Sequence, residues 1–103
     1  MEKSILTNYS FHPEAEQELI ESVNYYNDCE PGLGHDFSIE VYAAICRVIA
    51  QPKAWQILRH GVRRSLVSRF PYGVLYYIEK NEIVILAVMH LSRKPNYWKK
   101  RKK

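Results

Sequence analysis

The chain has 103 residues and a mass of 12.2 kDa, which is enough for one hydrophobic core and too little for two. Hydrophobic residues make up 47% and charged residues 25%, a balance typical of a globular domain and not of a disordered chain. The longest apolar run, at residues 83–89, is too short to span a bilayer. Neither a secretory signal nor a CxxC pair is visible, so we expect one cytoplasmic domain over residues 1–103 with a basic tail at about 99–103.

Charge is divided unevenly along the chain. The net charge is +4, but residues 1–46 hold one basic and nine acidic residues, whereas residues 47–103 hold fourteen basic and two acidic ones. A half this basic favours a polyanionic partner, which could be nucleic acid, a ribosome or an acidic protein segment. For the terminal run at 99–103 the alternative is a solvated tail that aids solubility.

The first half of the chain is predicted to form a strand and two helices. Residues 5–11 alternate as a half-buried strand does. His12-Pro13 begins a helix that continues to about Asn27, and Pro52 ends a second helix after a break at residues 31–34. The expected buried positions are Ala15, Leu19, Val23 and Tyr26 on the first helix and Phe37, Val41, Ala44, Ile45 and Val48 on the second. Two helices so joined form an antiparallel hairpin.

The second half is predicted to form three strands, at residues 62–70, 74–79 and 82–90, joined by a turn at 71–73 and a short loop at Lys80-Asn81. The last strand does not alternate at 83–88, so both of its faces should be buried. We expect Val84, Leu86 and Val88 on one face and Ile83, Ile85 and Ala87 on the other. The order β-α-α-β-β-β predicts an α+β fold, with the helical hairpin on one face of a mainly antiparallel sheet.

Several kinds of site find no support in the sequence. It contains no GxGxxG, GxxxxGK[ST] or GxSxG pattern. The histidines at 12, 35, 60 and 90 lack metal-ligand spacing. We therefore expect neither a cofactor nor a metal. The carboxylates of the first helix are interpreted as a solvated face and not as catalytic groups.

Arginines stand out in the strand at 62–70. A period of two places Arg63, Ser65, Val67 and Arg69 on one face and Arg64, Leu66 and Phe70 on the other. We expect Leu66 and Phe70 to face the helices, with Arg63 and Arg69 on the uncovered face or an edge. There their guanidinium groups would suit phosphates or carboxylates. The alternative is that these arginines pair with helix glutamates or remain solvated.

A second cluster follows the last strand, where His90, Arg93, Tyr97 and Trp98 come within nine residues. These side chains could carry out acid–base chemistry on a phosphodiester, with Arg stabilising charge and the rings stacking on bases. In the alternative interpretation, Tyr97 and Trp98 cap the edge of the core and His90 makes a buried hydrogen bond.

Residues throughout the chain resemble the RelE/ParE superfamily of bacterial type II toxins. The matching residues, in chain order, are His12-Pro13-Glu14-Ala15, Gly32-Leu33-Gly34 with Phe37, Pro52 with Trp55, Arg63-Arg64, Arg69-Phe70-Pro71-Tyr72, the run 74–77, Ala87-Val88-Met89-His90, and Arg93, Pro95, Tyr97 and Trp98. The β-α-α-β-β-β order agrees with the fold of that superfamily. The resemblance implies a toxin that a cognate antitoxin, bearing an acidic and apolar segment, holds inactive in a hetero-oligomer away from any membrane.

The resemblance leaves two targets open. RelE-like members cleave mRNA on the ribosome with Lys and Arg on the second and third strands and a later Arg and Tyr, whereas ParE-like members lack this set and poison DNA gyrase. Arg64 and Tyr97 match nuclease positions, and Arg93 lies about two residues from the position at which the nucleases have their later Arg. Leu66 stands where a Lys is expected and Gly73 where an Arg precedes Val-Leu-Tyr. These departures favour a ParE-like toxin that binds a protein target such as DNA gyrase, or an inert binding module of the same fold, over the nuclease.

Two sets of candidate site residues result. The candidates for catalysis are His90, Arg93 and Tyr97. The candidates for binding RNA or a target are Arg63, Arg64, Arg69, Trp98, Lys99, Lys100 and Arg101. A ribosome-dependent mRNA endoribonuclease is the first alternative to the ParE-like toxin, and an inert binding module of the same fold is the second.

Overall fold

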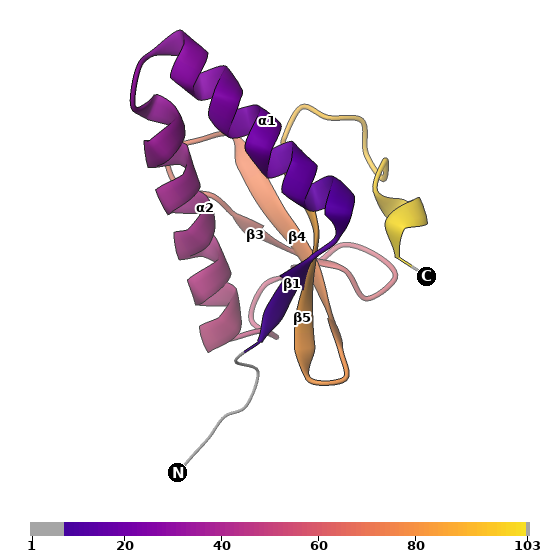
Figure 1. The fold of residues 1–103 in the computed structure, drawn as a ribbon. Coiled ribbons are helices and arrows are strands. Elements are labelled where there is room, and N and C mark those ends of the chain that lie inside the picture. Colours follow the sequence, from indigo (N-terminus) through magenta and orange to yellow (C-terminus); the bar gives the residue numbers. More distant parts are fainter. Residues whose placement is uncertain (1–7, 103) are drawn as a thin grey trace.

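The computed structural model describes residues 8–102, which form two helices on a five-stranded sheet (Figure 1). The elements are β1 (Tyr9–Phe11), α1 (Pro13–Cys29), α2 (Leu33–Ala50), β2 (Gln56–Ile57), β3 (Arg63–Leu66), β4 (Tyr72–Glu79), β5 (Glu82–His90) and the 3-10 turn η1 (Lys99–Arg101). The sheet order is β1-β5-β4-β3-β2; β1 runs parallel to β5, and the other neighbours are antiparallel. The predicted α+β class and element order are confirmed, with β2 as an additional edge strand. Part of the predicted first strand, residues 5–7, lies outside the described residues.

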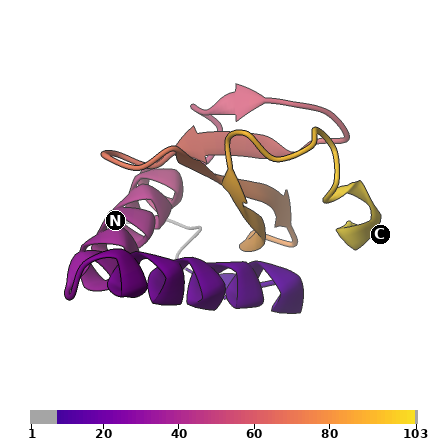
Figure 2. The ribbon, with the colours of Figure 1, turned by 90° about the horizontal axis from the view of Figure 1, so that it is seen from above.

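Both helices lie on one side of the sheet, and the C-terminal segment lies outside this helical layer (Figure 2). His12 caps α1, because its Nδ1 accepts a hydrogen bond of 3.1 Å from the backbone N–H of Glu14. The two helices approach closely at Gly34, where a Cβ would overlap the carbonyl oxygen of Val23. The nine predicted helix positions are all buried or packed against the core, which confirms the expected apolar faces. No helix of the described chain has the length and apolarity needed to cross a membrane.

Each face of the sheet carries its own buried cluster. Val74, Tyr76 and Ile85 point to the helices, whereas Leu75 and Met89 belong to a second cluster on the opposite face. That second cluster also contains Val62, Leu86, Ala87 and Trp98. The sheet is therefore buried on both sides over part of β4 and β5, as the lack of alternation predicted.

A β-bulge makes the predicted faces of β5 partly wrong. Leu75 pairs with Ala87 but Tyr76 pairs with Ile85, so Leu86 is an extra residue in the ladder. Leu86 and Ala87 therefore both join the cluster opposite the helices, and Val88 returns to the helix side with Ile83 and Ile85. A bulge reverses the alternation beyond it, which is why Val88 does not share a face with Leu86, nor Ala87 with Ile85.

The predicted strand at 62–70 is also corrected. Regular pairing ends at Leu66, and the chain then turns through Arg69, whose φ is 72°. The predicted turn at 71–73 is shorter, since Tyr72 and Gly73 already pair in β4. The N–H of Val67 donates to the carbonyl of Tyr72 across this loop, at 2.9 Å.

The two faces of β3 are the reverse of the prediction. Ser65 lies opposite Val74 on the helix side and is fully buried, whereas Leu66 faces away from the helices and is 53% exposed. A change of one residue in phase exchanges every side chain between faces. Phe70 does reach the helix-side core as expected, but it does so from the loop after β3, where strand alternation no longer applies.

Candidate functional site

The strand β5 is paired on one edge for only part of its length. The last hydrogen bond from the β1 side runs from the N–H of His12 to the carbonyl of Ile85, at 2.8 Å. Beyond this point, the N–H of Val88 donates to Glu18 Oε1 of α1 at 3.0 Å. The carbonyl of Leu86 accepts from Arg101 Nη1 at 3.1 Å. Two side chains thus satisfy backbone groups that a longer β1 would have paired.

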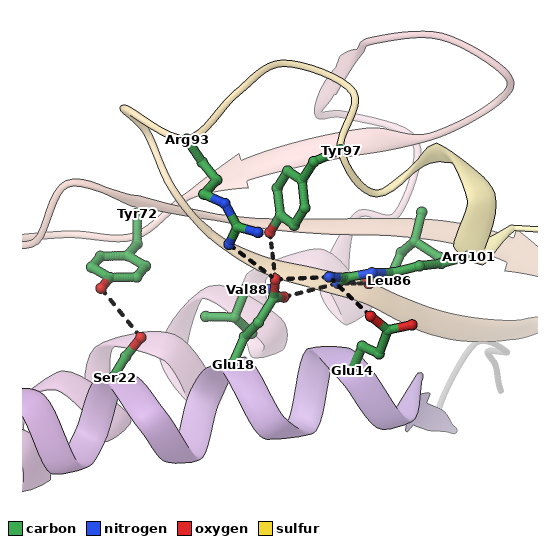
Figure 3. Close-up of polar contacts among 9 residues, drawn as sticks. All are labelled: Glu14, Glu18, Ser22, Tyr72, Leu86, Val88, Arg93, Tyr97 and Arg101. Atoms are coloured by element: carbon green, nitrogen blue, oxygen red, sulfur yellow. Dashed lines mark hydrogen bonds and ion pairs between the residues drawn. The ribbon is translucent and has the colours of Figure 1, made fainter.

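Glu18 is the centre of a polar cluster that joins α1 to the C-terminal segment (Figure 3). Its carboxylate accepts a hydrogen bond of 2.6 Å from the hydroxyl of Tyr97 and two of 3.0 Å from the guanidinium of Arg101. Arg93 completes this Glu18 cluster, with a guanidinium nitrogen 3.8 Å from Glu18 and its charge centre 3.9 Å above the Tyr97 ring. The two-pronged Arg101 contact is the strongest geometry available to such a pair.

This cluster corrects the interpretation of the α1 carboxylates. The side chains of Glu18 and Arg101 are only 13% and 9% exposed, so Glu18 does not belong to a solvated face. Helical spacing could have found it, because Glu18 follows Ala15 by three residues and precedes Leu19 on the buried stripe. Its partners lie 70 to 83 residues away in sequence, and no local pattern identifies them.

The environment of Tyr97 fixes the protonation of its hydroxyl. Burial raises the pKa of Tyr97 well above its ordinary value, and the hydrogen bond to Glu18 raises it further against the opposing effect of Arg101 and Arg93. The hydroxyl therefore remains a protonated donor at neutral pH. A group with so high a pKa is a poor general base.

The three predicted catalytic residues are not all brought together. Arg93 and Tyr97 are in contact, but among the described residues the ring of His90 makes its hydrogen-bond contacts with Ser92. Those contacts are 3.0 Å from the Ser92 N–H and 2.8 Å from its Oγ, and the His90 ring also packs edge-on against Tyr72. His90 itself is half-buried, but its hydrogen bonds with Ser92 are exposed, so the expected buried hydrogen bond of His90 is not found within the described chain.

A pocket of about 300 Å³ opens on the sheet face opposite the helices. Its apolar lining consists of Leu58, Met89, Leu91, Pro95 and Trp98. Its polar lining consists of Arg59, Arg64, Arg93 and Asn96. We call this cavity the arginine pocket. None of its nine lining residues is acidic, so its potential is positive, and a guanidinium above apolar surface suits an oxyanion carried on an apolar body.

Arg64 is the best-defined basic group of the arginine pocket. Its Nη2 donates to Gln56 Oε1 at 2.9 Å, and its buried Nε has no hydrogen-bond partner among the described residues. Its aliphatic stem lies against Gly73, where a Cβ would come within 3.0 Å of two Arg64 carbons. Gly73, which departs from the nuclease pattern, thus makes room for Arg64.

Of the other predicted binding residues, Arg63 and Arg69 lie outside the arginine pocket, whereas Trp98 lines it from the core. Arg63 points inward and donates to the carbonyls of Lys53 and Trp55 at 3.0 and 2.8 Å. Arg69 lies 3.7 Å from Glu40 and 4.0 Å from Asp36 of α2, as the alternative of pairing with helix carboxylates proposed. Trp98 is 2% exposed and belongs to the core.

Of the described residues 99–102 of the basic tail, Lys99 and Lys100 are exposed on η1, and Arg101 and Lys102 are half-buried. Arg101 belongs to the Glu18 cluster. The ammonium of Lys102 donates to the carbonyl of His60 at 2.6 Å. Residue 103 lies outside the described residues. Sequence reasoning did not identify Arg59, which carries no distinguishing pattern.

A helical hairpin on one face of a mixed sheet, with a basic pocket on the other face, defines a small α+β protein. The family described as the ParE toxin of the type II toxin–antitoxin system parDE matches residues 9–95. The chain therefore belongs to the ParE toxin family, which confirms the resemblance and implies an antitoxin as its partner.

A solved structure shares the fold. A chain from the chromosomal ParDE toxin–antitoxin system of P. aeruginosa superposes with a TM-score of 0.74 at 17% sequence identity, covering 85% of this chain and 99% of that chain. No curated protein shows significant sequence similarity to this chain.

Proposed function

We propose that the protein arrests growth by binding a protein target such as DNA gyrase through the sheet face that carries the arginine pocket. The observation that carries this proposal is the pocket itself. Arg59 and Arg64 stand beside an apolar lining, and no carboxylate is present to neutralise them within it. An acidic side chain flanked by apolar ones would complement this surface in both charge and shape.

The geometry favours binding over RNA cleavage. Cleavage through a 2′-hydroxyl needs a base, a cation and an acid around one phosphate. Tyr97 already donates its hydroxyl to Glu18, and His90 contacts Ser92 and not the other two candidates. Gly73 contributes space for Arg64 where the nuclease pattern has an Arg.

We further propose that the antitoxin covers the same face with an acidic and apolar segment, and that the two chains form a hetero-oligomer in the cytoplasm. Complementary charge would speed their association and disfavour other partners. Coexpression with the small protein encoded next to this chain should relieve growth inhibition. Arrest that persists in its presence would contradict the pairing.

The decisive experiment measures DNA supercoiling by purified gyrase with increasing amounts of the protein. The parent should inhibit supercoiling, and Arg64→Lys, which retains the charge but loses the planar fork, should need at least tenfold more protein. Arg69→Lys is the matched control, because Arg69 pairs with α2 outside the pocket, and it should inhibit like the parent.

The same strains should be used to map mRNA ends in translating cells. New ends without gyrase inhibition would contradict the proposal and favour the endoribonuclease. Binding of the antitoxin with neither effect, and without growth arrest, would favour an inert binding module.

A further inference from the structure

We propose that Glu18 is a positioning residue for the arginine pocket: it holds residues 93–101 against the sheet, and that segment forms one wall of the pocket. The inference rests on the proposed function only in assuming that the arginine pocket binds the target. The positioning itself follows from contacts between α1 and the C-terminal segment, and of the residues in the Glu18 cluster only Arg93 also lines the pocket.

Residues that line the pocket and a residue that contacts Glu18 are neighbours in this short segment. Asn96 and Trp98 line the pocket, whereas Tyr97, between them in sequence, turns to Glu18. Asn96 has a positive φ of 65°, a conformation that Asn tolerates better than most residues. The side chain of Tyr97 thus leaves the pocket side on which its neighbours Asn96 and Trp98 lie, so the position of the pocket wall depends on where Tyr97 is held.

The backbone of this segment has little other attachment to the sheet. Its hydrogen bonds are local ones, from Arg93 to His90, from Lys99 to Asn96 and from Arg101 to Trp98. The side-chain attachments within the described chain include the burial of Trp98, the bond from Lys102 to the His60 carbonyl, the bond from Arg101 to the Leu86 carbonyl, an ion pair of 3.6 Å between Arg101 and Glu14, and the Glu18 cluster. Of these, the Glu18 cluster and the weaker, exposed Glu14 pair connect the segment to α1.

The Glu18 carboxylate is also what allows Arg101 to be buried. A buried guanidinium without an anionic partner is strongly unfavourable. With Gln at position 18, Arg101 keeps only Glu14 as an anionic partner, 3.6 Å away and 67% exposed, so we expect its guanidinium to be more stable in water than beside the Leu86 carbonyl. The segment should then leave the sheet, expose Trp98 and open the pocket wall, while the helix-side core remains intact.

Trp98 provides a direct test, because the chain has only two tryptophans. In a Trp55→Phe background all tryptophan emission comes from Trp98, which is 2% exposed. Glu18→Gln should shift this emission to the red and raise its quenching by acrylamide several-fold. Trypsin should cut after Lys99 and Lys100 at least tenfold faster. Tyr97→Phe, which removes one donor, should give an intermediate result.

Two controls separate positioning from a general loss of stability. Glu21→Gln removes an exposed carboxylate one turn further along α1 and should behave like the parent. Val48→Ala weakens the helix-side core, where Val48 is fully buried; it should lower the melting temperature but leave Trp98 as protected as in the parent. The proposal would be overturned if acrylamide quenched Trp98 in Glu18→Gln no more than in the parent. It would also be overturned if Val48→Ala raised this quenching as much as Glu18→Gln does.

Growth arrest at matched soluble levels gives the functional readout. Glu18→Gln should lose arrest and Val48→Ala should keep it, at a temperature where both remain folded by circular dichroism. Full arrest by Glu18→Gln with Trp98 released would overturn the role in the pocket. If the parent leaves gyrase untouched but Glu18→Gln still releases Trp98 and loses arrest, the proposed target fails and the positioning role stands.

Discussion

The two faces of the sheet are closed in different ways. On one face, α1 and α2 bury a continuous apolar cluster that includes Phe37, Val41 and Tyr76. On the other, a segment with a single 3-10 turn covers part of β4 and β5 with Trp98, while the polar Glu18 cluster joins that segment to α1. The helical face has regular hydrogen bonding of its own, whereas the second cover depends on a few long-range contacts.

This difference suggests that the helix-covered face provides most of the stability, whereas the opposite face is available for binding. Helices keep their backbone groups paired, and the apolar surface that they bury stabilises the fold by about 25 cal/mol per Å². The helix-side core should therefore dominate the free energy of unfolding. A cover with few attachments opens at lower free energy than the whole domain. The arginine pocket lies on this second side, where a partner could displace or use the cover without unfolding the domain.

The largest effect should follow from Ile85→Asp. Ile85 is fully buried between β5 and the helices, and an isolated carboxylate there has no partner. We expect a loss of more than about 4 kcal/mol in the free energy of unfolding, measured by urea denaturation followed by circular dichroism. A variant that unfolds at the parent's urea midpoint would show that the helix-side core does not dominate stability.

Leu86→Asp is the matched change on the opposite face, because Leu86 is the next residue and is also fully buried. Water can reach this position once the C-terminal segment moves, so we expect about half the loss of Ile85→Asp. Trp98 emission should shift to the red before the helices unfold. Equal losses for the two variants, with one common transition, would remove the distinction between the two faces.

A smaller effect should come from the Glu18–Arg101 pair. Either Glu18→Gln or Arg101→Gln removes the closest partner of a charge at a site 9–13% exposed and leaves it only a more distant one, Glu14 for Arg101 or Arg93 for Glu18; the change should cost about 3 kcal/mol. The double variant should cost little more than either single one, giving a coupling energy of about 1–3 kcal/mol. Additive losses would mean that the two groups stabilise the fold independently.

The features that the sequence predicted well depend on local order. β5 matches its predicted range of 82–90, because its apolar run follows a two-residue turn in which Lys80 and Asn81 both have positive φ, at 52° and 62°. Such a turn fixes hairpin register. The apolar faces of α1 and α2 were equally predictable, since a period of 3.6 residues is visible without knowing the partner.

The features that the sequence missed depend on distant partners. The bulge at Leu86 comes from the pairing of β5 with β4, and β2 exists only because Gln56 and Ile57 pair with β3. The role of Glu18 requires Tyr97 and Arg101, which no spacing rule connects to α1. Arg64 was recognised as a candidate, but its contact with Gly73 and its place in a pocket became visible only in three dimensions.

The smallest predicted effect concerns Tyr97 at high pH. The pKa of Tyr97 is raised in the folded protein by burial and by the bond to Glu18, whereas in the unfolded chain it is about 10. The folded state therefore retains a proton that the unfolded state loses. The stability contributed by this group is fully present below pH 10 and is lost as the pH rises above it. Tyr97→Phe removes that dependence, so its free energy of unfolding should fall less steeply than the parent's above pH 10.

Tyr77→Phe is the matched control for this comparison. The pKa of Tyr77 is also raised by burial, but its ring belongs to β4 and contacts Lys102 instead of Glu18. At neutral pH, Tyr97→Phe should cost about 1.5–2 kcal/mol for the lost bond to a carboxylate, and Tyr77→Phe should cost less. Urea midpoints at pH 7, 9, 10 and 10.5 provide the measurement. If Tyr97→Phe and the parent lose stability in parallel above pH 10, the Tyr97 hydroxyl ionises as freely in the folded protein as in the unfolded one. The Glu18 contacts would then not keep the C-terminal segment closed over its face of the sheet, and the difference between the two faces would be larger than these contacts indicate.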